Sequence, residues 1–419
     1  MVFKCRTMAV ALVIVLALMT GIGQAAPSGL EVVELTLEQC LELAAENNPQ
    51  LQLAAVALDQ AKLGLKETKS EVRKLKDAEK VKSETNGGSP INGDDPFAPV
   101  MEMIMGMLTM APPSDLETTF YKDHGVWMAE EQVALAQAGY DLAGEGVRLA
   151  VINAYYDLLQ GEADLVTALA AEKEALEARR AVVAQFKVGM ATPAQDLAAE
   201  AGRAGARAAR LGAESVRETK RLALLREIGL SSDTRLVLSP PVEQQAGFEL
   251  EQVVQSALES SLEIRGAQFQ FDAAEKKFDL TGKWYPDITY KYKGSECEYL
   301  EAQIKLADTK IAVESGVRSS YNMYLAAKEQ LLPAQRGVEQ ARHDLNASRA
   351  KLEVGAATEL DLLSAKRALA QAESTLMGVK KNYAMATASL QAAAKGLTAG
   401  LTGATALGGG ATSDVRSQR

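Results

Sequence analysis

The sequence predicts a mainly α-helical protein made of two tandem repeats of long antiparallel coiled-coil hairpins, with little or no β-strand. One observation behind this prediction is a segment that occurs twice, as FKVGMAT at 186–192 and as LEVGAAT at 352–358, an offset of 166 positions. The same offset relates Val147 to Val313. Apolar residues at seven-residue steps are a second observation, and a glycine-threonine turn in each copy is the third. A register held over such a length is typical of a duplicated helical unit.

The first element is an expected signal peptide at residues 1–25. Lys4 and Arg6 precede an apolar stretch at 8–18, and Gly23-Gln24-Ala25 has the small residues of a cleavage site. The apolar stretch is shorter than the roughly 20 residues that a spanning helix needs. The sequence therefore predicts an exported protein whose signal is removed.

The repeats set the expected domain boundaries. Leu37-Glu38-Gln39 returns as Leu250-Glu251-Gln252, an offset of 213. The first repeat, 26–239, is longer than the second, 240–396, and we place its insertion at about 83–128. Residues 397–419 are rich in Gly, Ala and Thr without periodicity, which predicts a disordered tail.

Sustained heptads define the long helices of the second repeat. Large residues at seven-residue steps are Val317, Tyr324, Leu331, Val338, Leu345 and Leu352, and small ones lie three positions further on at Ser320, Ala327, Ala334, Ala341 and Ser348. Apolar residues spaced in this way keep one face of a helix towards a partner helix. In the first repeat the outgoing helix is expected from Val147 to Val188, a length of about 63 Å.

Each hairpin turn is predicted by its own residues. Gly189 and Gly355 stand where a helix needs a left-handed residue at its end, because glycine takes that conformation without a Cβ penalty. Thr192 and Thr358 follow as N-caps of the returning helices. Gln195 completes a capping box in the first turn. Two antiparallel helices per repeat are the consequence.

Composition excludes several classes of function. The net charge of −10 is spread along the chain, which argues against nucleic-acid binding. The sequence has two histidines, no nucleophile motif and no phosphate-binding loop, so we expect no enzyme and no cofactor. Cys40 and Cys297 are too far apart in sequence to suggest a disulfide framework or a metal cluster.

The order of these motifs resembles the TolC-like outer-membrane efflux proteins. Beside the two VGxAT turns, the resemblance rests on the segment 35–49, on 154–159, on 225–230 and on 284–288, and it covers most of residues 35–396. It implies a homotrimer that forms a hollow helical tunnel. It also implies a periplasmic adaptor (membrane-fusion) protein and an inner-membrane pump as partners.

By this resemblance, the hairpin tips dock the adaptor. The positions that match the family's tips are Gly189, Met190, Thr192, Gly355, Ala356 and Thr358, and Asp361 is a candidate acid at the tunnel entrance. The implied function is a passive conduit of a tripartite efflux or secretion system, located in the outer membrane or periplasm of the cell envelope.

The resemblance also implies membrane-spanning strands, and the sequence departs from it there. A spanning strand takes about 9 to 11 alternating residues. Residues 288–293 alternate but are too few, and their second face carries two lysines. A reduced or missing β-barrel is therefore expected, and it leaves a second hypothesis open: an envelope-spanning scaffold or coiled-coil interaction protein derived from the same family, without conduction.

A methionine-rich run within the insertion has three interpretations. Met101, Met103, Met105 and Met107 could form a Cu(I) patch, because thioethers are soft ligands. Adaptable Met side chains also suit a plug that faces lipid or a partner. A short apolar helix packed on the bundle is the third interpretation.

Overall fold

The structure is a computed structural model that describes residues 32–86, 116–241 and 247–397. Its elements, in chain order, are β1 (Val32–Leu35), α2 (Leu37–Asn47), α3 (Pro49–Asn86), α5 (Leu116–Lys187), α6 (Pro193–Ile228), β2 (Arg235–Leu238), α7 (Leu250–Ser260), α8 (Leu262–Trp284), α9 (Tyr290–Glu353) and α10 (Glu359–Ala394). The mainly helical fold with long antiparallel hairpins is confirmed. The expected signal peptide, the methionine run and the tail beyond residue 397 lie outside the described residues.

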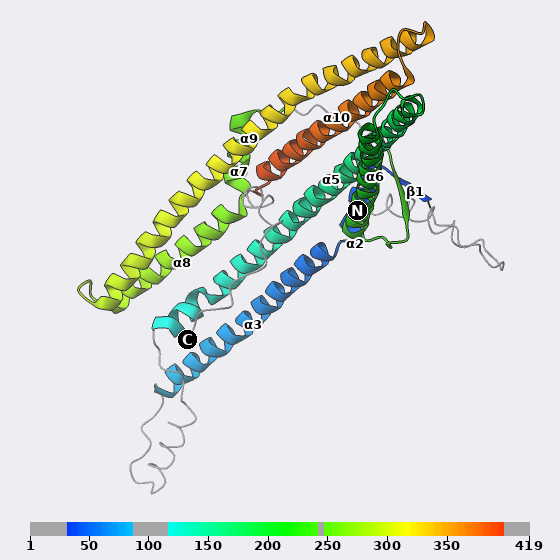
Figure 1. Ribbon diagram of the computed structural model, residues 1–419. Coiled ribbons are helices and arrows are strands. Elements are labelled where there is room, and N and C mark those ends of the chain that lie inside the picture. The colour runs from blue at the N-terminus through cyan, green and yellow to red at the C-terminus, as the bar shows by residue number, and fades with distance from the viewer. Residues whose placement is uncertain (1–31, 87–115, 242–246, 398–419) are drawn as a thin grey trace, which may run out of the picture.

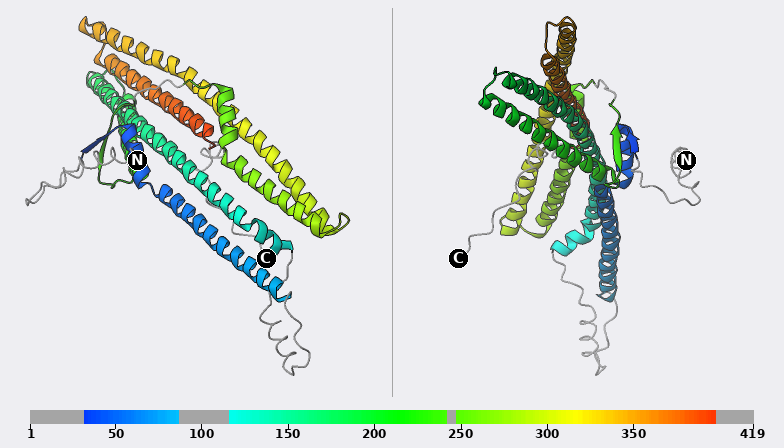
Figure 2. Two further views of the ribbon diagram at one scale, coloured as in Figure 1. Left: turned by 180° about the vertical axis from the view of Figure 1, so that it is seen from behind. Right: turned by 45° about the vertical axis from the view of Figure 1, so that its right-hand side comes forward.

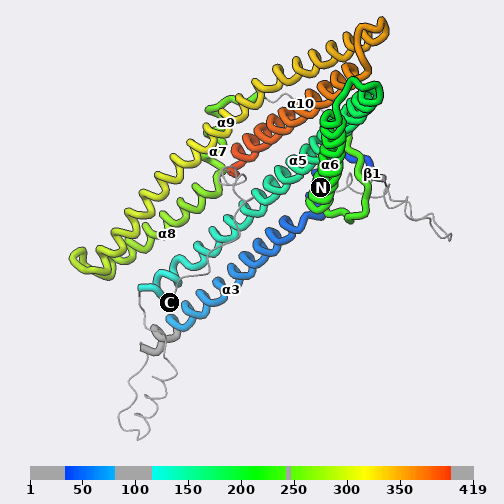
Figure 3. The backbone as a smooth tube through the Cα atoms, viewed as in Figure 1, coloured from blue at the N-terminus to red at the C-terminus, as the bar shows by residue number. Residues whose placement is uncertain are grey.

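The long helices lie side by side along a common direction (Figure 1). Towards one end the order across the molecule is α6, α5, α10, α9, and towards the other it is α3, α5, α8, α9. The tube view follows the same course (Figure 3). The view turned by 45° separates the two hairpins, α5 with α6 and α9 with α10 (Figure 2). The helices therefore form a layer with α3 and α6 at one edge and α9 at the other.

The outgoing helices are longer than the sequence predicts. Helix α5 has 72 residues, which corresponds to about 108 Å. It begins at Leu116 rather than near Val147, so residues 116–128, which we assigned to the insertion, are helical. Helix α9 has 64 residues and continues through Pro333. The seven-residue pattern revealed only the parts of these helices that pack on a coiled-coil partner.

The weak strand candidate at 288–293 is wrong. Thr289 is the N-cap of α9, where its hydroxyl accepts a hydrogen bond from the amide of Tyr292, and Tyr290 already lies in the helix. A side-chain cap of this kind starts a helix, whatever the alternation of the residues that follow.

Contacts near the middle of α5 join the short elements to the hairpins. Strands β1 and β2 pair in parallel, with Val32 opposite Arg235 and Leu35 opposite Leu238. The buried hydroxyl of Tyr155 on α5 donates to the carbonyl of Ser239 and lies 3.4 Å from that of Leu35. This tyrosine thus ties both strand ends to the longest helix. The sequence analysis missed the strand pair.

The heptad prediction is borne out by burial in α9. Val317, Tyr324, Val338 and Leu345 are buried against neighbouring helices, and so are Ser320, Ala327 and Ala341 of the small row. In the described part of the chain, no helix combines the length and the apolar character required to cross a bilayer.

Candidate functional site: the hairpin tips

The first hairpin tip joins α5 to α6. Gly189 has φ 76°, and its amide donates to the carbonyl of Phe186 at 3.0 Å. The amide of Met190 donates to Gln185 O at 2.8 Å, so the last carbonyls of α5 have partners. The Thr192 hydroxyl accepts from the amide of Gln195, and the Gln195 side chain accepts from the amide of Thr192 at 2.7 Å. The predicted left-handed glycine and capping box are both confirmed.

The second tip, between α9 and α10, is built in the same way. Gly355 has φ 73°, and its amide donates to Leu352 O at 3.0 Å. The amide of Ala356 donates to Lys351 O at 2.7 Å. The Thr358 hydroxyl caps α10 by accepting from the amide of Asp361. Both tips lie at the same end of the molecule (Figures 1 and 2).

Asp361 takes part in the cap of the second tip. One carboxylate oxygen, Oδ2, accepts from the Thr358 amide at 2.8 Å and from the Thr358 hydroxyl at 2.7 Å. These two donors hold the pKa of Asp361 below its usual value. The carboxylate is fully exposed and stays negative at the end of the hairpin. The candidate entrance acid therefore has a structural part in the turn.

Exposed apolar side chains surround both turns. Met190 is 78% exposed, and Val188 and Val354 are exposed to a similar degree. Nothing in the fold of the described chain buries these groups, and clustered exposed apolar side chains indicate a contact surface. The sequence analysis named Met190 but missed Val188 and Val354. Their position just before a helix-ending glycine was the signal that could have found them.

Polar side chains join the first hairpin to the second between α5 and α10. The buried Ser374 hydroxyl donates to Asp164 at 2.6 Å and accepts from Gln160 at 3.0 Å. Nearby, Lys381 pairs with Asp157 at 2.8 Å. Closer to the tips, Arg367 pairs with Glu174 at 2.5 Å. These contacts join α5 of the first hairpin to α10 of the second.

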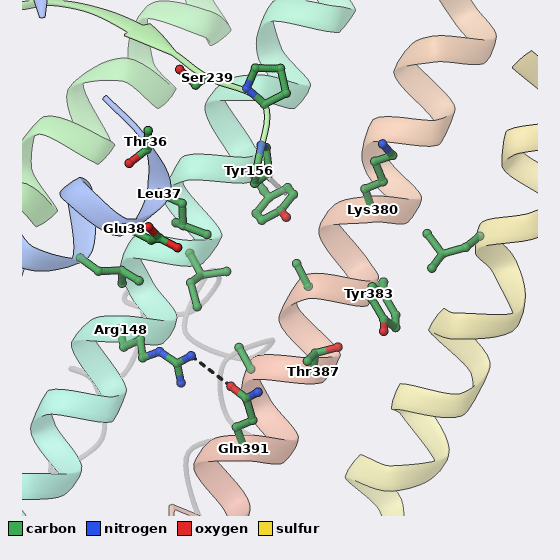
Figure 4. Close-up of a pocket in the computed structure, with 17 residues that line it drawn as sticks. Thr36, Leu37, Glu38, Arg148, Tyr156, Ser239, Lys380, Tyr383, Thr387 and Gln391 are labelled. Carbon is green, nitrogen blue, oxygen red and sulfur yellow. Dashed lines mark hydrogen bonds between the residues drawn. The ribbon is translucent and has the colours of Figure 1, made fainter. Parts of the chain in front are cut away.

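A pocket of about 340 Å³ lies near the middle of α5, between α2, α5 and α10 (Figure 4). Arg148 reaches across it to Gln391 at 3.0 Å and also pairs with Glu145 at 3.4 Å. Tyr156, Lys380 and Tyr383 line the same space. The charge of Arg148 is thus used to join α5 to α10.

Metal-ligating side chains do not gather in the residues that the structure describes, where no group of three or more His, Cys, Asp or Glu could hold an ion. The candidate thioether patch at Met101, Met103, Met105 and Met107 lies outside them. Cys40 is fully buried on α2, and burial raises its pKa to about 11, so its thiol stays protonated. Cys297 is exposed on α9.

The described chain thus combines long helical hairpins with capped tips at one end (Figure 1). Residues 291–395, most of α9 and all of α10, match the family model of the outer membrane efflux proteins. Among curated proteins, none matches this sequence.

Solved structures extend the likeness to most of the chain. The outer membrane protein VceC from Vibrio cholerae is similar with a TM-score of 0.59 at 16% identity, over 86% of this chain and 96% of its own. The Campylobacter jejuni CmeC outer membrane channel has a TM-score of 0.61 at 14% identity, and the match covers 86% of this chain and 85% of that channel. The Neisseria gonorrhoeae MtrE outer membrane channel has a TM-score of 0.54 at 16% identity, and the match covers 90% of this chain and 95% of that channel. The resemblance to TolC-like efflux proteins is therefore confirmed: the chain has the fold of these channels, and residues 291–395 match the outer membrane efflux protein model.

Proposed function

We propose that this protein is the tunnel subunit of a tripartite efflux or secretion system in the cell envelope. The observation that carries the proposal is the pair of capped hairpin tips at one end, each presenting exposed apolar side chains. A periplasmic adaptor that bridges to an inner-membrane pump fits these tips. Conduction through the tunnel would be passive, since the protein contributes walls and a docking end.

The edges of the helix layer support assembly with further copies. On α3, Leu53, Val56 and Leu63 are exposed, and on α9 the exposed apolar residues include Leu300 and Ile304. Because α3 and α9 lie at opposite edges, a copy that joins edge to edge uses two different surfaces. Such contacts close into a ring when the rotation permits. A homotrimer is the ring that we propose, by analogy with the family.

The test is photocrosslinking in cells from which the protein comes. A photoreactive residue at Met190 or Ala356 should capture an adaptor, and the same residue at Tyr290, at the far end, should not. Met190 and Ala356 are better positions than Gly189 and Gly355, whose positive φ makes any side chain costly. If neither tip position captures a partner while the trimer forms, the docking proposal fails.

Conductance separates the tunnel from a scaffold that only bridges envelope layers. The purified assembly, reconstituted in planar bilayers, should conduct ions if it is a tunnel. Tips that capture an adaptor in an assembly that never conducts would favour the scaffold.

A further inference from the structure

The turn between α8 and α9 lies at the end of the molecule opposite to the docking tips (Figure 1). Helix α8 ends at Trp284, and α9 begins at Tyr290, so only residues 285–289 connect them. The amide of Tyr285 donates to Thr281 O at 2.9 Å, and the amide of Thr289 donates to Pro286 O at 3.0 Å. This connection is a short, hydrogen-bonded turn.

Four aromatic rings stabilise the hairpin just below this turn. Phe278 on α8 packs on Tyr292 at 5.2 Å and stacks on Tyr299 at 5.5 Å, both on α9. Phe271 packs on Tyr299 at 5.5 Å. Aromatic pairs in this range contribute beyond their buried area. The hairpin thus has packed aromatic rings of its own next to the turn.

Apolar side chains in the turn point away from that core. Ile288 is 87% exposed and Tyr290 is 98% exposed, and Trp284 is also exposed. A turn that only reverses the chain is expected to carry polar residues at such positions. Tryptophan and tyrosine are instead the residues enriched where a protein meets the interface of a bilayer.

Charge in the turn is opposite to that of the whole chain. Residues 283–293, with Lys283 and Lys293 included, contain three lysines and one aspartate, whereas the chain carries a net charge of −10. The ammonium group of Lys291 lies 3.0 Å from the Tyr285 hydroxyl and 4.9 Å from the centre of its ring. Lys293 pairs with Glu296, one turn into α9. Lysines beside exposed aromatic rings can keep their charge at lipid headgroups while the rings enter the apolar region.

We propose that the α8–α9 turn is a lipid-contacting surface that inserts Ile288, Tyr290 and Trp284 into the interface of a bilayer containing anionic phospholipid. Lys283 and Lys291 would meet the lipid phosphates, because cationic side chains near the surface are attracted to an anionic leaflet. The insertion is shallow and needs no spanning segment. This inference does not depend on efflux: it describes how the end of the rod opposite the docking tips is held at a membrane.

Tryptophan fluorescence tests the contact at the residue itself. The chain has two tryptophans, so Trp127→Phe leaves Trp284 as the only tryptophan, which is excited selectively over the tyrosines. Vesicles of phosphatidylcholine and phosphatidylglycerol in equal parts should shift its emission to the blue, and brominated lipid should quench it. Phosphatidylcholine alone should give weaker binding, and salt should weaken binding to the mixed vesicles.

Variants show whether the turn causes the binding. The double variant Ile288→Ser, Tyr290→Ser should lower the vesicle partition coefficient by about tenfold or more, because two inserted apolar groups are lost. The matched control, Val188→Ser with Val354→Ser, removes exposed apolar groups from the opposite end and should bind vesicles like the parent.

Three results would overturn the proposal. One is unchanged Trp284 emission in the presence of mixed vesicles. Another is flotation of the double variant with vesicles as efficiently as the parent. The third is a double variant that changes self-association but not vesicle binding, which would identify the turn as a protein contact. Circular dichroism of each variant establishes that the helices are retained.

Discussion

At the scale of single residues, four glycines decide how the helices end. Gly189, Gly229, Gly355 and Gly396 all have positive φ, and the amide that follows each one returns to a carbonyl of the helix before it. Their surroundings differ. A Cβ on Gly189 or Gly355 would meet nothing within 4 Å, whereas one on Gly229 would lie 2.6 Å from Asn47 Cβ. On Gly396 it would lie 2.3 Å from Ser260 O. The first pair forms free tips, and the second pair packs against helix junctions.

This difference gives a matched pair of substitutions. Gly229→Ala should destabilise the protein more than Gly189→Ala, because both strain the backbone by about 1 kcal/mol and only Gly229→Ala collides with Asn47. Urea denaturation followed by circular dichroism measures the two midpoints. Equal midpoints would mean that the junction at Asn47 moves aside without cost.

At the scale of the elements, the two tips differ in the residue that completes the capping box. Gln195 in the first is neutral, and Asp361 in the second is charged. Because Asp361 has a lowered pKa, its contribution to the fold is present above the unfolded value of about 3.8 and is lost as the pH falls through the lower folded value. The second tip alone should therefore loosen in acid.

Threonine substitutions measure this difference. At neutral pH Thr192→Ala and Thr358→Ala should each raise hydrogen exchange at their own tip, as the loss of an N-cap costs about 1 kcal/mol. On acidification the effect of Thr358→Ala should shrink and that of Thr192→Ala should not. Thr309→Ala is the control, since Thr309 lies within α9 and its hydroxyl only returns to Lys305 O. Tip peptides followed by mass spectrometry report the exchange. An identical pH response at both tips would contradict the assigned role of Asp361.

Helix lengths at this scale were only partly predictable. The turns at 189–192 and 355–358 were predicted to the residue, because glycine and threonine act locally on the backbone. The start of α5 at Leu116 was not, because that end of the helix packs on α3 instead of the coiled-coil partner that sets the heptads. The strand candidate at 288–293 failed for a related reason: a side-chain cap at Thr289 outweighed a short alternating pattern.

At the scale of the whole molecule, the layer of helices has two apolar edges. Leu63 on α3 is 61% exposed and Ile304 on α9 is 69% exposed. Exposed apolar residues scattered singly need no explanation, but Leu53, Val56 and Leu63 follow one another along one helix. Edges of this kind are expected to join between copies.

Charge placed on either edge should prevent that assembly. Leu63→Glu or Ile304→Glu should convert the proposed trimer to monomers without loss of helix, because a carboxylate cannot be buried unpaired at an apolar contact. Analytical ultracentrifugation gives the mass and circular dichroism the helix content. The control Met190→Glu, on a free tip, should leave the proposed trimer intact. Assembly that tolerates both edge variants would exclude the proposed ring contacts.

The sequence by itself determined the periodic and local features: the helical class, the seams of α9, and the two capped turns, because each depends on neighbours within a few residues in the chain. The tertiary structure decided what depends on distant partners. Residues far apart in sequence come together in three places. Strand β1 pairs with β2, the Tyr155 hydroxyl lies between the carbonyls of Leu35 and Ser239, and Ser374 hydrogen-bonds to Asp164. The tertiary structure also decided which apolar side chains are exposed. Whether an apolar residue such as Ile288 is buried or meets the surroundings depends on which helices lie beside it, and no local pattern records that.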